Sequence, residues 1–464
     1  MNNIIQQFEK NISLEVEKIL KDILLNSDKD ITEVIRTIKT LLDELGRDLC
    51  KWIIETVDET LKESSKRKKE WNIVKKKERS LMTEFGEIKY DRRYYRSKDT
   101  GEYRYLAEDR LGIEKYQRMD RSLEAKLVDM ASKDAYNKVG TNAVDSLEIS
   151  DQTVMNKVRK VGKIENNELN ETDEKKEVKC LYIEADEDHV ALQSGKKSMP
   201  RLIYVHEGRE KTENKVRLKN KYTFSGVYNN SEKLWLEVMD YIEKNYQVDK
   251  IEKIFLLGDG APWIKSGLDW LPKTKYILDR YHLVKYFRKA TRYSEEEVKE
   301  KLWCGIEEVD RKLVKESFSE LISNVDSDKR KAKIRKARCY IYNNWEGIKN
   351  YSQDKDAIGC SAEGHISHIL ADRLSSRPLS WSKKGVDYMS RLRAFKSNGG
   401  DKTNLKELLL RKEKEAKKEK RLMEIESERV TSKLKQKFAG PEKNIPSIKK
   451  GKKTGLTRTL RNIM

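Results

Sequence analysis

The sequence predicts an α/β protein in which a mixed sheet carries helices, is interrupted by an all-helical insertion and is flanked by helical regions. Three observations predict this class. Apolar residues recur at spacings of three and four over residues 1–80, which is typical of amphipathic helices. Short apolar runs then alternate with helical patterns between residues 178 and 290. Residues 291–356 are strongly helical and charged, as is the start of 401–464.

Charge is the strongest compositional signal. The chain has 464 residues, with 99 Lys and Arg against 79 Asp and Glu, so its formal net charge is +20. Such a surplus favours a polyanionic partner, and nucleic acid is the commonest large polyanion in cells. No apolar run is long enough to span a membrane, so we expect no membrane contact. The N-terminus lacks secretory-signal order and the five cysteines are dispersed, which predicts a cytoplasmic protein.

The N-terminal part is predicted to be helical and then to form a small hairpin. Residues 1–80 contain no proline and read as a charged helical region, which could supply an oligomer seam. A basic block at residues 66–77 is either a phosphate contact or a solvated helix face. From residue 81 the pattern alternates and is rich in Tyr and Arg. Lys98–Gly101 is a turn signal between two strand-like runs, which predicts a hairpin.

Residues 119–163 have the outline of a helix-turn-helix, so that 81–163 as a whole is predicted to be a DNA-binding region. Ser150 is the predicted N-cap of the second helix. The polar segment 164–177 is predicted to be a linker. The DNA contacts predicted for the second helix are Lys157, Arg159 and Lys160.

Strands and helices alternate in the part of the chain that follows. The predicted strands are 178–186, 189–193, 201–206, 253–257 and 276–278, and the predicted helices are 231–246, 263–270 and 280–290. Three hairpin-connected strands followed by alternating helices and strands are the element order of the ribonuclease-H fold. We therefore predict a ribonuclease-H-like mixed sheet over residues 178–400, with the helical insertion at about 291–356.

Two aspartates lie where apolar strands are predicted to end. Asp186 follows one apolar run, and Asp259 follows another within the tight turn Gly258–Gly260. A carboxylate at a strand end beside glycines is accessible to a metal ion and a substrate, whereas most Gly-Asp-Gly tripeptides taken alone are ordinary turns. Glu184 and Asp188 remain alternatives to Asp186, because residues two apart on a strand share a face.

Four blocks in order resemble the ISLre-type family of bacterial insertion-sequence transposases. They are YIEADEDHVALQ, LLGDGAPWIKSG, LDRYHLVKYF and AEGHISHILADRLSSRPLSWSKKGVDYMSRLRA. Members of that family are D-D-E enzymes with a ribonuclease-H-like core, related to the Mutator-like superfamily. The resemblance covers roughly residues 75–400. It also implies an all-helical insertion between the second Asp and the Glu, which agrees with the pattern of residues 291–356.

The resemblance implies a set of site residues. Asp186, Asp259 and Glu363 match the catalytic, metal-binding triad, and Asp279 and His282 match the D-x-x-H pair that follows the second acid. The implied cofactor is Mg²⁺, for which Mn²⁺ can substitute. Magnesium is a hard ion that prefers oxygen ligands, and two such ions can activate the attacking oxygen and neutralise the leaving oxygen of a phosphoryl transfer.

The sequence thus predicts a D-D-E transposase that cleaves and joins the DNA of an insertion sequence, acting on element ends and target DNA as a homo-oligomer. Two alternatives remain: a non-catalytic DNA-binding derivative, and a structure-selective nuclease on the same fold. Residues 401–464 are Lys-rich and are predicted to form a basic helix and tail. Further phosphate contacts are predicted near Glu363 at Arg373, Arg377, Lys383 and Lys384.

Overall fold

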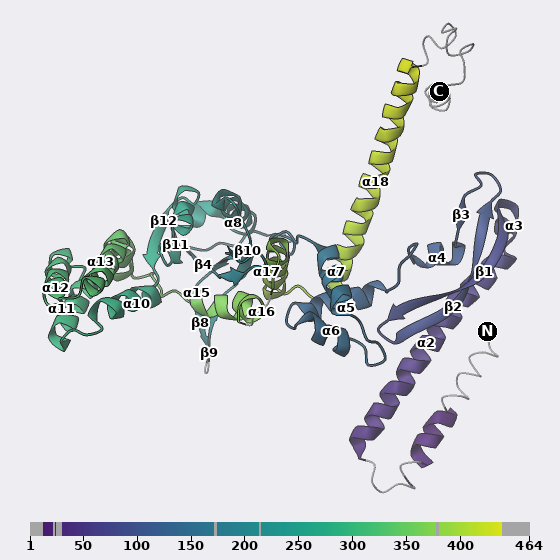
Figure 1. Cartoon of the computed structure of the whole chain (residues 1–464), viewed down its shortest axis with the longest axis horizontal. Helices are drawn as coiled ribbons and strands as arrows, with labels where there is room; N and C mark the ends of the chain where they lie inside the picture. The colour runs from purple at the N-terminus through teal and green to yellow at the C-terminus, as the bar shows by residue number, and fades with distance from the viewer. Residues whose placement is uncertain are drawn as a thin grey trace, which may run out of the picture. The chain divides into compact units, whose positions relative to one another are not determined.

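The computed structural model of the chain divides into two units, Met1–Lys406 and Glu407–Met464. The structure describes residues 13–21, 24, 30–170, 174–212, 215–376 and 380–438 (Figure 1). The tail predicted at the C-terminus lies outside these residues beyond position 438. None of the described helices is long and apolar enough to cross a membrane.

The N-terminal region contains a long helix and then a strand. Helix α2 (Ile31–Glu63) is followed by the short helix α3 (Ser65–Glu70), and strand β1 (Trp71–Thr83) begins at once. The predicted helix is therefore wrong over residues 71–80. Most of β1 is exposed, so its burial does not alternate along the strand and its charged residues carry no period-2 signal. Pairing with the next segment of the chain, residues 86–97, rather than local propensity, makes this segment a strand.

Strand β1 belongs to a three-stranded antiparallel sheet. It pairs with β2 (Gly86–Ser97), which pairs with β3 (Tyr103–Arg104). The turn predicted at Lys98–Gly101 connects β2 and β3 and is confirmed, with the Gly101 amide donating to the Ser97 carbonyl at 3.2 Å. Helix α2 covers this sheet through a small apolar core of Ile54, Leu81, Ile88 and Tyr90.

Short helices follow this sheet. They are α4 (Leu106–Leu111), α5 (Arg121–Ala131), α6 (Tyr136–Asn142) and α7 (Asp151–Val161). The predicted N-cap of α7 is confirmed, because the Ser150 hydroxyl accepts a hydrogen bond from the Thr153 amide. Gly140 on α6 lies against the backbone before α7: an added Cβ would be 1.8 Å from the Ile149 carbonyl oxygen, so only glycine fits there.

The largest sheet has five strands in the order β10-β7-β4-β11-β12 (Figure 1). Strand β4 pairs antiparallel with β7, and β7 with β10, whereas β4, β11 and β12 run parallel to one another. The mixed α/β class predicted from the sequence is confirmed. The strands are β4 (Cys180–Glu187), β7 (Arg201–His206), β10 (Tyr222–Gly226), β11 (Lys253–Gly258) and β12 (Thr274–Leu278).

One predicted member of this sheet is wrong. The segment 189–193 supplies only β5 (Val190–Ala191), which pairs with β6 (Lys197–Ser198) outside the five-stranded sheet. The missing strand is β10, whose five residues are all buried. Its Thr and Ser residues give the segment the composition of a loop. Their hydrogen-bond partners come from distant segments, so the sequence pattern does not reveal that the strand is buried. A second missed feature is the hairpin of β8 (Arg209–Thr212) and β9 (Lys215–Leu218).

Helices cover both faces of the five-stranded sheet. Helix α8 (Ser231–Asn245) packs on one face, with Trp235 completely buried in the largest core. The short helix α9 (Pro262–Lys265) and a 3₁₀ turn join the same core. On the other face, Tyr182, Phe255, Leu257 and Ile277 pack against Tyr351, Ala357, Ile358 and Cys360.

Both edge strands of this sheet receive hydrogen bonds from an asparagine side chain. At β10, Asn398 accepts from the Thr223 amide at 2.7 Å and donates to the Thr223 carbonyl at 2.8 Å. At β12, Asn350 donates to the Tyr276 carbonyl at 2.9 Å. Backbone groups at both edges are therefore satisfied by side chains rather than by another strand.

The insertion is all-helical, as predicted for residues 291–356. Its apolar core includes Leu302, Phe318, Ile334 and Ile341. Helix α10 (Arg280–Thr291), which matches the helix predicted at 280–290, leads into it, and its own helices are α11 (Glu296–Glu307), α12 (Arg311–Ser323), α13 (Asp328–Asn343) and α14 (Trp345–Gln353). After it come α15 (Ala362–His365), a π-helical turn (Ile366–Ala371), α16 (Asp372–Leu374), α17 (Lys383–Ser397) and α18 (Lys402–Phe438).

Candidate active site

Three aspartates lie at the ends of three neighbouring parallel strands. Asp186 is near the end of β4, Asp259 directly follows β11 and Asp279 directly follows β12. Leu257 is paired with Glu184, so two residues further along the same register Asp259 lies beside Asp186. Gly258 and Leu278 are paired in the same way, which places Asp279 on the other side of Asp259. Neighbouring strands are about 4.8 Å apart, so these carboxylates gather at one edge of the sheet.

The strand period also assigns a face to these acids. Tyr182 on β4 and Leu257 on β11 belong to the apolar cluster on the face opposite α8. Side chains two apart on a strand share a face, so Asp186 and Asp259 lie on that same side of the sheet. The segment that packs there runs from Tyr351 to Cys360 and leads directly into α15, which carries Glu363.

The electrostatics of Asp186 link it to the other predicted acids. Its pKa is raised to about 7, chiefly by burial, and the negative charges of Asp259 and Glu363 raise it as well. A hydrogen bond from the Glu187 amide and the nearby His282 act in the opposite direction. Asp259 and Glu363, 104 residues apart in sequence, therefore act on the same carboxyl group. The structure brings the three predicted acids into one electrostatic neighbourhood.

Asp279 and His282 form a hydrogen-bonded pair at the start of α10. The buried Asp279 carboxylate accepts from the Tyr281 amide and from His282 Nδ1, both at 2.9 Å. Burial lowers the pKa of His282, but the hydrogen bond and charge of Asp279 outweigh it and the net shift is upward. The charges of Asp186 and Asp259 also raise the pKa of His282. His282 is thus a helix-start residue held by Asp279, and the neighbouring acids favour its protonated form.

The donor atoms at this site suit a hard divalent cation, although the side chains do not converge on one point. Carboxylate oxygens are the ligands that Mg²⁺ prefers. Burial chiefly raises the pKa of Asp186, and a bound cation would relieve the added repulsion from Asp259 and Glu363. Within the part of the chain that the structure describes, no group of three His, Cys, Asp or Glu side chains is assembled to hold a metal ion. Asp186, Asp259 and Glu363 therefore fit the cation in chemistry and would have to close around it.

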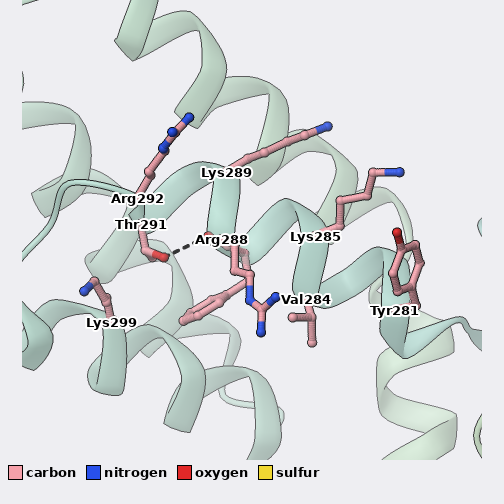
Figure 2. A pocket seen from close by; sticks show the side chains of 9 residues that line it. Tyr281, Val284, Lys285, Arg288, Lys289, Thr291, Arg292 and Lys299 are labelled. Carbon is pink, nitrogen blue, oxygen red and sulfur yellow. Dashed lines mark hydrogen bonds between the residues drawn. The ribbon is translucent and has the colours of Figure 1, made fainter.

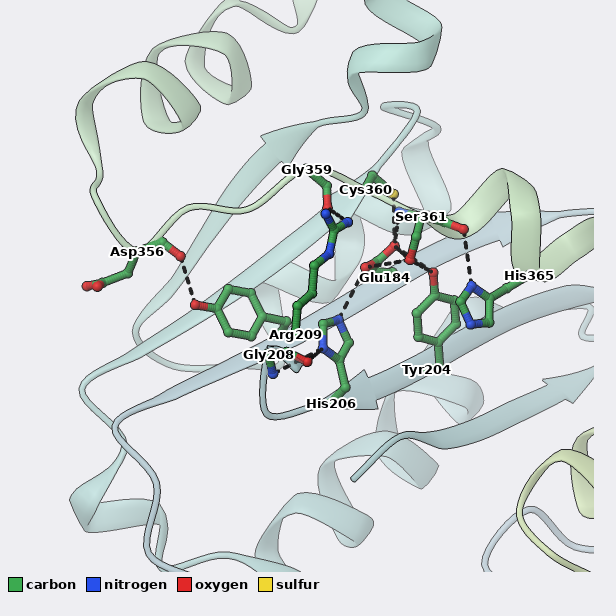
Figure 3. Close-up of polar contacts among 11 residues, drawn as sticks. Glu184, Tyr204, His206, Gly208, Arg209, Asp356, Gly359, Cys360, Ser361 and His365 are labelled. Carbon is green, nitrogen blue, oxygen red and sulfur yellow. Dashed lines mark hydrogen bonds and ion pairs between the residues drawn. The ribbon is translucent and has the colours of Figure 1, made fainter. Parts of the chain in front are cut away.

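Glu184, an alternative to Asp186 in the sequence, lies in a buried hydrogen-bond cluster (Figure 3). Its completely buried carboxylate accepts from the Tyr204 hydroxyl at 2.5 Å, from His206 Nε2 at 3.2 Å and from the amide and hydroxyl of Ser361. Burial raises the pKa of Glu184, but these hydrogen bonds outweigh it and lower the pKa to about 2. Glu184 thereby anchors Ser361, two residues before Glu363.

This cluster is the functional feature that the sequence analysis missed. A signal was present in the run RLIYVH, where Tyr204 and His206 are polar, lie two apart and therefore face the same side of β7. Tyr204 is the register partner of Glu184 on the adjacent strand. Asp188, the other alternative, is engaged through Oδ1, which accepts from the Ser375 hydroxyl at 3.0 Å and from the His189 amide, whereas its buried Oδ2 has no hydrogen-bond partner among the described residues.

Comparison with known proteins identifies the family of the chain. Residues 24–413 match the family described as "Uncharacterised protein family (UPF0236)". The chain belongs to the UPF0236 family. Its relatives include a UPF0236 protein of Caldanaerobacter subterraneus subsp. tengcongensis that is 47% identical over 399 residues, spanning 86% of this chain and 84% of the relative. A second protein of that organism is 47% identical over 391 residues, spanning 84% of each chain. That bacterium carries many UPF0236 paralogues.

The solved structures include one with a weak likeness to this UPF0236 chain. It is the Drosophila P element transposase strand transfer complex, with a TM-score of 0.24 and 10% sequence identity. The likeness spans 65% of this chain and 86% of that one. A TM-score this low does not establish a common fold.

The three cations of α7 that are predicted to contact DNA do not all have the exposed surroundings that this prediction requires. Lys157 and Lys160 both donate to the buried carboxylate of Glu124, at 2.5 and 2.8 Å. These two ammonium groups hold α7 to α5, which carries Glu124. Arg159, between them in sequence, is exposed. In this UPF0236 chain the helix therefore offers one exposed guanidinium rather than three unengaged cations.

The cations predicted near Glu363 also differ in their surroundings. Arg373 is buried, donates to the Ala131 carbonyl at 2.9 Å and lies over the rings of Tyr136 and Trp381. Its guanidinium belongs to the interior, so we remove Arg373 from the expected phosphate contacts. The remaining three are Lys383, which is exposed and donates to Asn229 at 2.9 Å, Lys384, which is exposed, and Arg377, which lies outside the described residues.

Proposed function

We propose that this protein is a D-D-E DNA transposase of the ISLre type, with Asp186, Asp259 and Glu363 as its acidic pocket. The observation that carries the proposal is the position of Asp186 and Asp259 at neighbouring parallel strands on one face of the sheet, the side on which the segment leading to Glu363 packs. Burial chiefly raises the pKa of Asp186, and the charges of Asp259 and Glu363 add to it. Perturbed carboxyl groups that share a neighbourhood are characteristic of catalytic sites.

The sheet topology supports a ribonuclease-H-like core for this enzyme. Numbered along the chain, the five strands have the spatial order 3-2-1-4-5, in which the first three are antiparallel and the last two run parallel to the first. The first acid is on the central strand and the second follows its parallel neighbour. The many paralogues in one bacterium are also what a mobile element would produce.

In this proposal each residue of the site has a separate role. Asp186, Asp259 and Glu363 would hold Mg²⁺, which when bound supplies activation of an attacking oxygen and charge neutralisation at a leaving oxygen. Asp279 orients His282 through Nδ1 and leaves Nε2 for a phosphate oxygen or a proton near the acids. Glu184 positions α15 by holding Ser361. No covalent protein–DNA bond is required, so no nucleophilic side chain is invoked.

Substitution of the second acid tests the proposal. The full-length Asp259→Asn variant is expected to bind the DNA of the element ends like the unmodified protein and to lose strand cleavage by at least about 100-fold, because one cation ligand and its charge are removed. Asp269→Asn is the matched control, since Asp269 is exposed on the 3₁₀ turn after α9. Gel analysis of nicked DNA measures cleavage, and fluorescence anisotropy measures binding.

The same assay separates the alternatives. Strand-transfer products in a target plasmid identify a transposase, whereas cleavage without joining identifies a nuclease on the same fold. DNA binding by the unmodified protein with neither product identifies a non-catalytic derivative. An Asp259→Asn protein that still nicks at the rate of the unmodified protein contradicts the assigned pocket.

A further inference from the structure

A cavity of about 580 Å³ lies beside α10, the helix that begins immediately after Asp279. Figure 2 shows cationic side chains fanning out from successive turns of α10, with Lys299 approaching from α11. Val284 and Phe287 supply an apolar floor. We call this feature the α10 groove. Its cations are Lys285, Arg288, Lys289, Arg292 and Lys299.

Most of the charge of the α10 groove has no ion-pair partner among the described residues. The chain from residue 280 to residue 294 has five Lys and Arg and no Asp or Glu. Lys285, Arg288, Lys289 and Arg292 are exposed, and among the described residues none has a carboxylate within ion-pair distance. Lys299, by contrast, pairs with Glu296 at 2.8 Å. Four like charges on one helix repel one another, and an anionic ligand would relieve that repulsion.

The near end of the α10 groove lies beside the Asp279–His282 pair. Tyr281 lines its near end, is about half exposed and contacts the ring of His282 edge-on at 5.3 Å between centroids. His282 in turn is hydrogen-bonded to Asp279 at 2.9 Å, and Asp279 lies beside Asp259 at the edge of the sheet. One side chain therefore separates the groove from the neighbourhood of the acids.

The spacing of the cations suits a nucleic-acid strand. At about 1.5 Å per residue, the helix rises about 10 Å from Lys285 to Arg292. Phosphates of one DNA strand advance about 3.4 Å per base pair along the duplex axis, so this length matches about three phosphates. Lysine and arginine contacts of this kind fix the register of DNA without reading its sequence.

We propose that the α10 groove binds the phosphodiester backbone of the DNA strand that enters the acidic pocket, and so positions that strand for cleavage. The inference rests on the proposed function, because it takes the acids as the place of cleavage. It assigns a DNA-binding role to α10, for which the sequence predicted no DNA contact. An acidic protein segment is the competing ligand, and the experiment distinguishes the two.

A matched pair of full-length variants tests the groove. The groove variant is Lys285→Ala/Arg288→Ala/Lys289→Ala. The control is Lys312→Ala/Lys315→Ala/Arg335→Ala, which removes the same residue types from exposed positions of α12 and α13. Affinity for a fluorescent duplex of the element end is measured by anisotropy over a range of salt concentrations. We expect the groove variant to lose about tenfold or more in affinity and its salt slope to shrink by up to about 3, at about 0.9 per phosphate contact.

The outcomes are separable from those of the proposed function. An equal loss of affinity for the duplex in both variants, or an unchanged salt slope, would show a bulk charge effect and would overturn the proposed role of the groove. DNA is supported as the ligand if polyglutamate does not displace the duplex from the protein and if the variant Lys285→Arg/Arg288→Lys/Lys289→Arg, which keeps the positive charges, binds the duplex as the unmodified protein does. Binding of polyglutamate in preference to the duplex overturns the proposal. If the groove binds DNA but the protein does not cleave it, this inference holds and the proposed transposase activity is contradicted.

Discussion

Three acidic residues at the end of β4 have three different surroundings, which the sequence alone could not separate. Glu184 and Asp186 lie on β4 and Asp188 directly follows it, so the three are spaced two apart and the strand period does not distinguish them. Ser361 and Ser375, more than 170 residues away in sequence, engage Glu184 and Asp188 through hydrogen bonds. Asp186 is therefore distinguished by contacts that depend on the whole fold. The choice of Asp186 over its two acidic neighbours stays a prediction, for which these surroundings are the physical argument.

The raised pKa of Asp186 predicts a pH-dependent stability. An acid whose pKa is about 7 when folded binds protons more tightly in the folded state, so it lowers the free energy of unfolding as pH rises from about 4 to about 7. In the presence of EDTA, Asp186→Asn should remove this cost and stabilise the protein at pH 8 by on the order of 1 kcal/mol, with little change at pH 4. Urea denaturation at both pH values measures the effect.

The control for this variant is Asp269→Asn, which should leave the pH profile unchanged. Added Mg²⁺ should then raise the melting temperature of the unmodified protein more than that of Asp186→Asn, because ligand binding stabilises the folded state. Identical stability of the two proteins at pH 8, with and without Mg²⁺, would contradict the electrostatic description of the pocket.

Glu184 predicts the opposite dependence on pH. Its pKa is lowered to about 2, so its stabilising hydrogen bonds are present above pH about 4.5 and are lost as pH falls towards 2. Glu184→Gln keeps the shape but loses the charge, and should cost about 2 kcal/mol at pH 7 and much less at pH 3. Chemical denaturation at the two pH values checks this, with Glu243→Gln on α8 as an exposed control. A constant difference across the range would contradict the charged cluster.

At the scale of elements, the strands with branched apolar residues were predicted well and the strands that depend on partners were not. Strands β4, β7 and β11 contain continuous apolar runs, and the helices of the insertion show the helical period, so both signals are local. Strand β10 is instead buried with Thr223 and Ser225 in its interior. Their burial is tolerated because the Thr223 hydroxyl is hydrogen-bonded to the Ser397 hydroxyl and the Ser225 hydroxyl donates to the Arg201 carbonyl. A sequence pattern does not contain that information.

The asparagine at the edge of β10 provides a test at this scale. Asn398 satisfies both the amide and the carbonyl of the buried residue Thr223. Asn398→Ala should leave both groups unpaired and lower the free energy of unfolding by about 2–4 kcal/mol. Asn398→Asp keeps only the acceptor oxygen, so its free energy of unfolding should lie between those of Asn398→Ala and the unmodified protein. Denaturant unfolding measures the series, for which Asn324→Ala at the C-terminal end of α12 is the control. Equal losses for Ala and Asp would show that the amide geometry is not what stabilises the strand.

At the scale of the whole molecule, the positive charge predicts how strongly DNA is held. With 99 basic residues and a net charge of +20, many contacts should release counterions from DNA. We expect affinity to fall at least tenfold between low and physiological salt, as it does for proteins that contact several phosphates. Anisotropy titrations measure the slope. A flat dependence on salt would contradict electrostatic binding and would favour a different class of ligand.

The two capped edges of the five-stranded sheet also constrain how copies of the chain can associate. Exposed edges are where sheets from separate molecules join by strand addition, and here Asn398 and Asn350 already occupy backbone groups on β10 and β12. A continuous intermolecular sheet through this core would have to displace both side chains. Assembly on DNA, if it pairs two copies, should therefore use helical surfaces and leave the hydrogen exchange of these edge amides unchanged.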